Sequence, residues 1–274
     1  MQNNSFARLD QQVAIVTGGT QGLGAAIAAT LAQRQLGGLL ICGRNVDKGL
    51  AQAAAIQQDT GVPVQFEVAD LEQVADCRRV VQAAHARFGR IDILVNAAGV
   101  TDRGTLLDTD PALFDRLFAV NVRAPFFLMQ DAVKHMRADG IEGRIVNIGS
   151  MSSLAGQPML AAYCSSKGAL ATLTRNSAYG LLRNRIRVNA LNIGWMASEG
   201  EDHIQRTHHG AAADWQAAAG QAQPFGRLID PWEVARAVAF LASAESGLMT
   251  GSVIAYDQSV WGGYDAAPQP SAPL

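Results

Sequence analysis

The sequence predicts a single doubly wound α/β domain, in which helices cover both faces of a parallel sheet of about seven strands. Short, continuous apolar runs alternate with longer amphipathic stretches along the 274 residues. Continuous apolar runs are typical of parallel strands that are buried on both faces, and amphipathic stretches between them are typical of the covering helices. Neither an internal repeat nor a linker divides the chain, so we expect one domain over residues 1–265.

The apolar runs place the expected strands at 13–17, 39–42, 64–68, 91–95, 144–148, 186–191 and 252–256. The amphipathic stretches place the expected helices at about 22–35, 45–59, 72–88, 111–138, 158–183 and 231–243. Two segments interrupt this alternation. Residues 194–230 form a long insertion after the sixth strand, where lids lie in such folds. Residues 266–274 are rich in proline and alanine, and we expect a disordered tail there.

Composition argues against several classes of function. The chain has 22 Lys and Arg and 24 Asp and Glu, a formal net charge of -2, so no basic surplus indicates a nucleic-acid partner. No apolar run approaches the roughly 20 residues of a membrane helix, and the N-terminus lacks the pattern of a signal peptide. The three cysteines follow no metal-binding spacing. We therefore expect reduced thiols, no metal site and a cytoplasmic protein.

A glycine-rich turn follows the first expected strand. Its glycines at 18, 22 and 24 allow a tight turn and a close backbone approach to a pyrophosphate, and the next helix offers free N–H groups to that anion. A purely structural turn is the alternative, but a position after the first strand of an alternating pattern favours a dinucleotide site. The cofactor contacts expected from this turn are Gly18, Thr20, Gln21, Gly22, Leu23 and Gly24.

Residues after the second and third strands bear on which dinucleotide is bound. The second strand ends without a carboxylate to bind a ribose 2′-hydroxyl, and Arg44 follows it. We therefore expect NADP in preference to NAD, with a solvated loop cation as the alternative for Arg44. Asp70, with Leu71 packed beside it, could accept from the adenine amino group. Capping the next helix is an equally good and compatible role for Asp70.

Tyr163 and Lys167 are the most informative pair in the chain. A free phenol has a pKa of about 10 and is a poor acid or base at neutral pH. An ammonium one helical turn away favours the phenolate, and the earlier Ser150 hydroxyl could hold a substrate oxygen. This set suits proton transfer to or from an alcohol or carbonyl oxygen. An isolated Tyr-x-x-x-Lys, however, is more often an amphipathic helix with a buried tyrosine and a solvated lysine.

With these residues assembled, the chain resembles the short-chain dehydrogenase/reductase family over about residues 10–263. The resemblance rests on Thr17-Gly18-x-x-x-Gly22-x-Gly24, Asn96-Ala-Ala-Gly99, Asn121, Ser150 and Tyr163-x-x-x-Lys167. It implies a single-domain Rossmann fold and an oxidoreductase that transfers a hydride between NAD(P) and an alcohol or carbonyl. It also implies a homotetramer, formed through the helices around 111–138 and 158–183.

The resemblance also implies roles for individual residues. Tyr163 is the acid or base, Ser150 bonds the substrate oxygen, and Lys167 binds the nicotinamide ribose and lowers the tyrosine pKa. Asn121 would hold a water that links Lys167 to solvent; a helix-interior side chain bonded to nearby backbone is the alternative. Further dinucleotide contacts are implied at Asn96, Ala97, Ala98, Gly99 and Gly194.

Two segments depart from the family pattern. Asn192-Ile193-Gly194 stands where Asn-Pro-Gly is usual, so the entry to the lid should differ. Asp257-Gln258-Ser259 stands where Asp-Gly-Gly is common. A threonine that binds the nicotinamide carboxamide commonly follows the first of these motifs, and we expect Ser198 to replace it.

The substrate contacts expected are Ser150, Ser152, Gln157, Tyr163 and Trp195. The polar segment 199–203 could bond hydroxyl groups, which favours a sugar or polyol; a solvated loop is the alternative interpretation. A 3-oxoacyl thioester reductase is the second candidate enzyme. A dinucleotide-binding regulator without chemistry is the candidate from a different class, although such a protein would not need both Tyr163 and Lys167.

Overall fold

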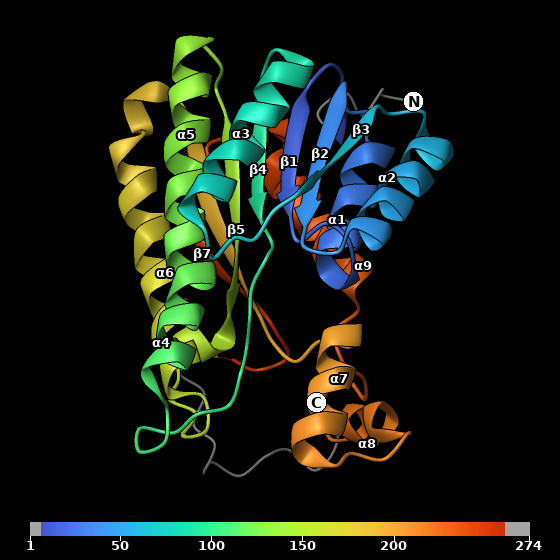
Figure 1. Cartoon of the computed structure of the whole chain (residues 1–274), viewed down its shortest axis with the longest axis vertical. Coiled ribbons are helices and arrows are strands. Elements are labelled where there is room, and N and C mark those ends of the chain that lie inside the picture. Colours follow the sequence, from blue (N-terminus) through green and yellow to red (C-terminus); the bar gives the residue numbers. More distant parts are fainter. Residues whose placement is uncertain (1–6, 261–274) are drawn as a thin grey trace, which may run out of the picture.

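A seven-stranded parallel sheet runs through the middle of the protein in a computed structural model that describes residues 7–260 (Figure 1). The predicted tail at 266–274 lies outside the described residues. The strands are β1 (Val13–Thr17), β2 (Gly38–Gly43), β3 (Val64–Val68), β4 (Ile93–Asn96), β5 (Arg144–Ser150), β6 (Arg187–Ile193) and β7 (Val253–Tyr256). Their order in the sheet is β3-β2-β1-β4-β5-β6-β7. From β1 the chain adds β2 and β3 on one side, and then crosses over to add β4 to β7 on the other. Ligands of such folds bind at this switch point, between β1 and β4.

All seven expected strands are present, and the predicted doubly wound α/β fold is confirmed. β1 and β3 have the expected bounds, because their apolar runs end at glycine or a polar turn. β5 and β6 extend two residues further than expected towards their carboxyl ends. This extension carries Ser150 onto the last position of β5.

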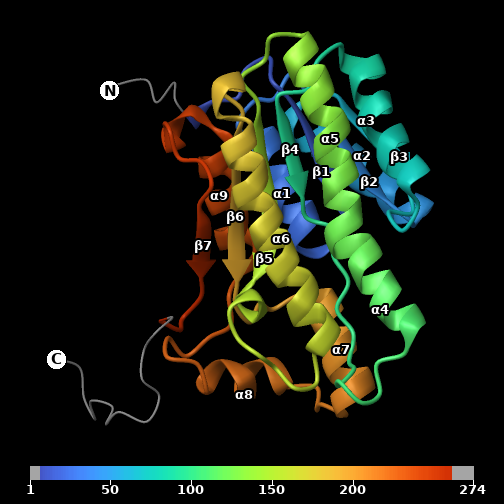
Figure 2. The ribbon, with the colours of Figure 1, turned by 90° about the vertical axis from the view of Figure 1, so that its left-hand side faces the viewer.

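Helices cover both faces of the sheet (Figures 1 and 2). One face packs against α1 (Gly22–Gln33), α2 (Val46–Thr60) and α9 (Pro231–Ala242). The other packs against α3 (Val74–Phe88), α5 (Ala124–Ala138) and α6 (Ala161–Gly180). Two apolar cores result, one on each side; the central strands between them are almost fully buried, whereas the edge strands β3 and β7 are only partly buried. Short 3₁₀-helical turns occur at η3 (Met151–Ser153), η4 (Leu182–Asn184) and η5 (Ala244–Ser246).

The single helix expected at 111–138 is wrong in detail, because a π-helical turn interrupts it. α4 (Pro111–Phe118) leads into η2 (Ala119–Arg123), and α5 follows directly. In η2 the Ala124 amide donates to the Ala119 carbonyl, five residues back. Pro125 has no N–H for the carbonyl four residues before it, so a regular α-helix could not be complete there. Such π turns are frequent at functional sites, and this one carries Asn121.

The insertion between β6 and α9 contains two helices rather than only irregular chain. α7 (Glu199–His209) and α8 (Trp215–Gln221) lie beyond the carboxyl ends of the strands (Figure 2). Ser198 caps α7 by accepting from the Glu201 amide at 3.1 Å, and acidic residues in the first turn favour the helix dipole. We call residues 194–230 the β6–α9 segment.

The β6–α9 segment is fastened at its base. The Ile229 amide donates to the Trp195 carbonyl and the Ala197 amide donates to the Ile229 carbonyl, each at 3.0 Å. The first and last residues of the segment are therefore held side by side. No helix within residues 7–260 is long and apolar enough to cross a membrane.

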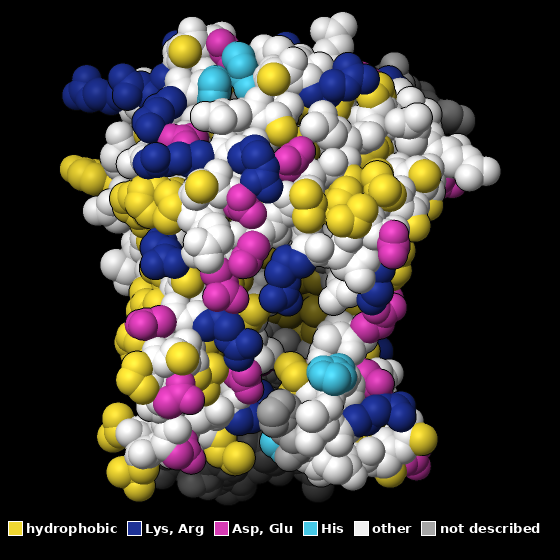
Figure 3. Space-filling model, in the orientation of Figure 1, with side chains coloured by type: hydrophobic (Ala, Val, Ile, Leu, Met, Phe, Trp, Pro, Cys, Tyr) yellow, Lys and Arg dark blue, Asp and Glu magenta, His cyan; other side chains and the backbone are white. Residues whose placement is uncertain are grey.

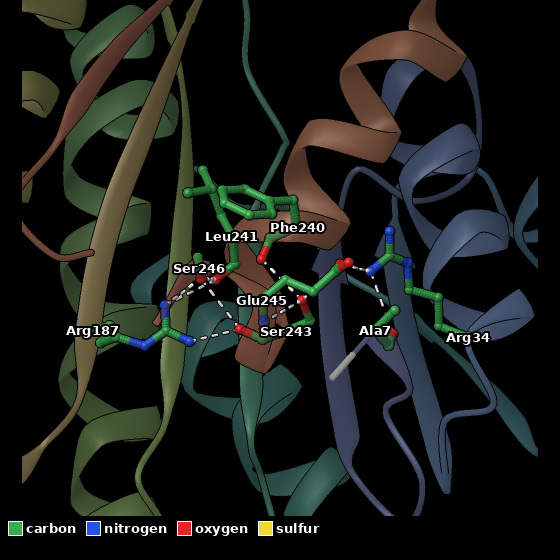
Figure 4. A network of polar contacts seen from close by, with 8 residues as sticks. All are labelled: Ala7, Arg34, Arg187, Phe240, Leu241, Ser243, Glu245 and Ser246. Atoms are coloured by element: carbon green, nitrogen blue, oxygen red, sulfur yellow. Dashed lines mark hydrogen bonds and ion pairs between the residues drawn. The ribbon is translucent and has the colours of Figure 1, made fainter. Parts of the chain in front are cut away.

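A polar network ties the end of α9 to β6 and α1 (Figure 4). The Arg187 guanidinium on β6 donates to the Ser243 carbonyl at 2.8 Å and to the Leu241 carbonyl at 3.5 Å. Arg34 of α1 pairs with Glu245 at 2.7 Å. These contacts satisfy carbonyl groups that the end of α9 leaves without helical partners. The network holds α9, and with it the end of the β6–α9 segment, against the sheet.

Replacing Arg187 by leucine should lower the free energy of unfolding by about 2 kcal/mol, because two half-buried carbonyl groups lose a charged donor. Urea unfolding followed by circular dichroism measures the change. Arg183→Leu is the control, since Arg183 is exposed, and it should change stability by less than about 0.5 kcal/mol. Equal effects of the two substitutions would contradict this account of the network.

Candidate active site

A cavity of about 1200 Å³ lies where the carboxyl ends of the strands face the β6–α9 segment. Figure 3 shows the surface hollowed in this region, between the body of the molecule and its lower part. Ordinary small-molecule pockets measure roughly 300–1,000 Å³. The cavity therefore has room for a cofactor and a substrate together.

The cavity brings together every predicted site residue except Asn96 and Asn121, and the structure describes all of them. The predicted residues on its wall are Gly18, Thr20, Gln21, Gly22, Leu23, Gly24, Arg44, Asp70, Leu71, Ala97, Ala98, Gly99, Ser150, Ser152, Gln157, Tyr163, Lys167, Gly194, Trp195 and Ser198. Residues from both ends of the chain thus form one continuous wall.

The glycine turn has the geometry that an anion site requires. Gly18 and Gly22 adopt positive φ values of 67° and 53°, which favour glycine. A Cβ on Gly24 would overlap the Gly18 carbonyl, so α1 packs directly against the turn. No side chain caps α1, and its first turn has no acidic residue. Its free amide groups can therefore receive the pyrophosphate of a dinucleotide.

Thr17 fixes the opposite wall of this site. Its hydroxyl oxygen accepts from the Ala97 and Ala98 amides, each at 3.1 Å. A Cβ on Gly18 would lie 2.9 Å from the Ala98 Cα, so the two turns are in close contact. The carboxyl ends of β1 and β4 are locked together at the switch point by these contacts. Sequence reasoning used Thr17 only as part of a motif and missed this role.

Asn96 does not reach the cavity, contrary to its prediction as a cofactor contact. Its side chain is buried and donates to Asn147 at 2.8 Å, and Asn147 donates to Thr174 at 3.0 Å. These two side-chain hydrogen bonds join β4, β5 and α6 within the core. Asn96 therefore supports the wall of the site from behind.

Asn121 clamps the loop after β4 to α6. Its Oδ1 accepts from the Val100 amide at 3.0 Å, and its Nδ2 donates to the Val100 carbonyl at 2.9 Å and to Ser166 Oγ at 3.1 Å. Ser166 in turn donates to the Tyr163 carbonyl at 2.7 Å. These partners lie outside the helix that carries Asn121. The π turn thus points this side chain at the loop and at the helix of Tyr163.

The Tyr163 phenol forms a hydrogen bond with Ser150 at the end of β5. Burial raises the phenol pKa above its usual value of 10.0, and the Ser150 hydrogen bond and the charge of Arg103 offset this only in part. In the protein without cofactor the net shift of the Tyr163 pKa is therefore upward, opposite to the lowering that the resemblance implies, because burial outweighs the Ser150 and Arg103 contributions. At neutral pH the phenol holds its proton and can donate it.

Lys167 is buried, and its Nζ donates to the Ile148 carbonyl at 2.9 Å. Its Nζ lies 5.8 Å from the centre of the Tyr163 ring. No carboxylate within residues 7–260 forms an ion pair with it, and burial lowers its pKa to about 8. A Cβ on Gly99 would come within 3.4 Å of Nζ, so a glycine there leaves room. The remaining ammonium donors are available to ligand oxygens in the cavity, such as ribose hydroxyls.

The substrate end of the cavity combines polar side chains with apolar ones such as Met151, Leu160 and Met196. Ser152 donates to Gln157 at 2.8 Å, and both residues line the wall. The Trp195 indole N–H donates to Glu201 at 2.9 Å, and its ring stacks on Trp215 with centroids 6.0 Å apart. These contacts hold Trp195 as a fixed wall of the cavity.

Ser198 also lines the cavity, but its hydroxyl is the cap of α7 described above. Other wall residues were not predicted, including Arg103, Gln205 and Gln223. They lie in the loop after β4 and in the β6–α9 segment, where no periodic pattern or motif marks them. The Ser198-x-x-Glu201 spacing was the sequence signal for α7 that sequence reasoning missed.

The departures from the family pattern have structural partners. A Cβ on Gly194 would overlap the Asp257 carboxylate, so the two segments are in contact. Gln258 accepts from the Phe225 amide at 2.8 Å and donates to the Arg227 carbonyl at 2.6 Å. Gln258 thus fastens the last part of the β6–α9 segment to the end of β7, which a glycine could not do.

Replacing Lys167 by methionine should stabilise the folded protein at pH 7. A folded pKa of about 8 lies below the unfolded value of about 10.4, so the buried ammonium costs up to about 3 kcal/mol below pH 8. The substitution also removes the hydrogen bond to the Ile148 carbonyl, which offsets part of this effect. The free energy of unfolding should therefore rise by about 1–3 kcal/mol. The gain should shrink as the pH rises from 8 towards 10.4.

Urea unfolding at pH 7 and at pH 10 measures this stabilisation. Lys134→Met is the control, because Lys134 is exposed on α5 and should respond little at either pH. A destabilised Lys167→Met variant, or a gain of the same size at both pH values, would contradict the burial cost.

Within the described residues, His, Cys, Asp and Glu side chains form no group of three that could hold a metal ion. The three cysteines are unpaired.

The chain is similar to known dehydrogenases and reductases over most of its length. A family model described as enoyl-(acyl carrier protein) reductase matches residues 18–262. The 2-(S)-hydroxypropyl-CoM dehydrogenase 3 of Xanthobacter autotrophicus is 36% identical, over 91% of this chain and 96% of the relative. Galactitol 2-dehydrogenase of Agrobacterium fabrum is 29% identical, over 93% and 99%. The crystal structure of a short-chain type dehydrogenase/reductase from Mycobacterium marinum superposes with a TM-score of 0.84 at 28% identity, over 93% of this chain and 97% of that one.

Proposed function

The chain belongs to the short-chain dehydrogenase/reductase family and is an oxidoreductase, and we propose that it interconverts a small polyol and its carbonyl form with NADP. The observation that carries the proposal is the Tyr163 phenol, which bonds Ser150 on the wall of the cavity. Lys167, with donors to spare, lies on the same helix one turn away. A protein that only bound a dinucleotide would have no use for this arrangement.

The residues present fit a nicotinamide dinucleotide. When bound, that cofactor supplies or accepts the hydride. The free amides of α1 suit its pyrophosphate, and the glycines at 18 and 24 leave the backbone open to it. Lys167 has donors for the nicotinamide ribose. Asp70 and Leu71 line the other end, where adenine would lie.

NADP is favoured over NAD by the residues at the end of β2. Gly43, Arg44 and Asn45 line the cavity there and include no carboxylate for a ribose 2′-hydroxyl. Lys48 adds a second cation nearby, because its Nζ donates to Gln21 of the glycine turn at 3.1 Å. Arg44 and Lys48 together suit a 2′-phosphate.

Tyr163 moves the proton. In carbonyl reduction the phenol would give its proton to the substrate oxygen, while the bound cofactor would supply the hydride to the carbon, which yields the alcohol. Ser150 donates to the same oxygen and stabilises the charge that develops on it. In alcohol oxidation the steps reverse, and Tyr163 must first lose its proton. Asn121 acts as a positioning residue, because it holds the loop after β4 next to Lys167 and α6.

A polyol is supported by the polar wall around Tyr163, which includes Ser152, Gln157 and Gln205. Galactitol 2-dehydrogenase, a relative of this chain, is named for such a substrate. An acyl thioester remains the second candidate substrate, because Met151, Leu160 and Met196 also line the wall. The β6–α9 segment would close over the substrate as a lid, because it carries Trp195, Gln205 and Gln223 on its cavity side.

The enzyme is further proposed to be a cytoplasmic homotetramer. Three unpaired cysteines suit a reducing compartment. Phe114 on α4 and Phe126 on α5 are 44% and 45% exposed, which suits a subunit contact on this pair of helices.

Tyr163→Phe should lose at least about 100-fold in kcat/KM on alcohols and carbonyls, because a positioned acid or base contributes that much or more. Its affinity for the dinucleotide, followed by fluorescence of the reduced cofactor, should stay within about threefold, since the ring remains. Sugars, polyols and ketones should be assayed with NADP and with NAD, and NADP should give the lower KM.

Tyr179→Phe is the matched control, because Tyr179 is 81% exposed on the same helix and should keep full activity. Cofactor binding without turnover of any compound, and with no effect of Tyr163→Phe, would show a binding protein rather than an enzyme.

A further inference from the structure

Arg103 connects the body of the protein to the β6–α9 segment, the proposed lid, at the mouth of the cavity. It lies in the loop between β4 and α4, is half-buried and lines the cavity. Its Nε donates to Nε2 of His209, the last residue of α7, at 3.2 Å. Arg103 therefore stands where the lid meets the site, and the proposed cofactor and proton-transfer roles do not use it.

Among the residues that the structure describes, the rest of the Arg103 guanidinium has no partner and could bind a ligand. Neither Nη group has a hydrogen bond or ion pair to any residue between 7 and 260 that the structure describes. The neighbouring Asp102 forms an ion pair with Arg116, at 2.5 Å. Four N–H donors of this half-buried cation thus have no acceptor among the described residues.

Arg103 and Tyr163 line the same cavity. The guanidinium is close enough that its charge lowers the pKa of the Tyr163 phenol. Glu201 is the acidic residue on the facing side, but its Oε1 already accepts from Trp195 at 2.9 Å and from Gln205 at 2.8 Å. Glu201 is stabilised within the lid and does not form an ion pair with Arg103.

We propose that Arg103 binds a carboxylate of the substrate, so that the polyol oxidised at Tyr163 is a hydroxy acid that carries this group. This inference rests on the proposed function, since it names the class of its substrate. A guanidinium presents paired N–H donors in a plane, which match the two oxygens of a carboxylate. The bound carboxylate would provide the half-buried cation with its missing acceptor and hold the lid contact in place.

A phosphate ester shares this chemistry, and the test must separate the two groups. The probes are D-gluconate, D-glucitol and D-glucitol 6-phosphate, together with 3-hydroxybutyrate and its neutral counterpart 2-pentanol. Activity with NADP is measured for each probe, and binding to the protein is followed by quenching of tryptophan fluorescence, since Trp195 lines the cavity. The carboxylates should have a kcat/KM at least about tenfold above their neutral partners.

Arg103→Gln should lower kcat/KM for the carboxylates by about 10- to 100-fold, mainly through KM, and change the neutral alcohols by less than about threefold. Arg103→Lys should recover part of the loss. Arg206→Gln is the control, because it removes an exposed charge from the same lid. His209→Phe keeps Arg103 but removes its contact with the lid, and it should preserve the preference for carboxylates.

Three results would overturn the inference. The first is equal use, or equal lack of binding, of carboxylates and neutral alcohols by the wild-type enzyme. The second is loss of the carboxylate preference in His209→Phe, which would make Arg103 a fastener of the lid. The third is a preference for the phosphate ester. Any of these leaves the proposed oxidoreductase intact, whereas carboxylate binding that needs Arg103 but leads to no turnover would refute the proposed function alone.

Discussion

A buried ammonium group without a carboxylate partner is the constraint on which the rest of the site depends. Lys167 lies in the core at the carboxyl edge of the sheet, and among the described side chains no acid pairs with it. Burial lowers its pKa to about 8, so the protonated form is costly at neutral pH. The fold tolerates this because the Ile148 carbonyl accepts one N–H and the cavity leaves the others open to a ligand. The buried Lys167 ammonium therefore lowers the stability of the folded protein, but it supplies N–H donors for binding and catalysis.

The surrounding structure keeps that ammonium beside the phenol. Thr17 locks the ends of β1 and β4, so that Gly99 lies against the ammonium. The π turn then points Asn121 at both the loop after β4 and Ser166 on α6. Because Tyr163 and Lys167 share α6, any shift of this helix would move acid and ammonium together. The relative positions of strand ends, loop and helix are fixed by short polar contacts that the apolar core protects from water.

Sequence patterns predicted the sheet, the glycine turn and the Ser150–Tyr163–Lys167 set, because periodicity and position after a strand determine where such residues lie. They did not predict side-chain direction, so Asn96 was placed on the cavity although it bonds Asn147 inside the core. The break in the helix at 111–138 depends on one missing N–H at Pro125, which a periodic pattern does not register. Arg103 lies in irregular chain, where only tertiary contacts decide what a side chain faces.

The pKa of Lys167 in the protein without cofactor tests the central claim most directly. The chain contains three lysines, Lys48, Lys134 and Lys167, so protein labelled with ¹³C at lysine Cε should give three resonances that can be assigned by substitution. We expect the Lys167 resonance to titrate near pH 8, well below the ordinary lysine pKa of about 10.4. A Lys167 resonance that titrates near 10.4 would show that the ammonium is well solvated and would contradict the proposed cost of its burial.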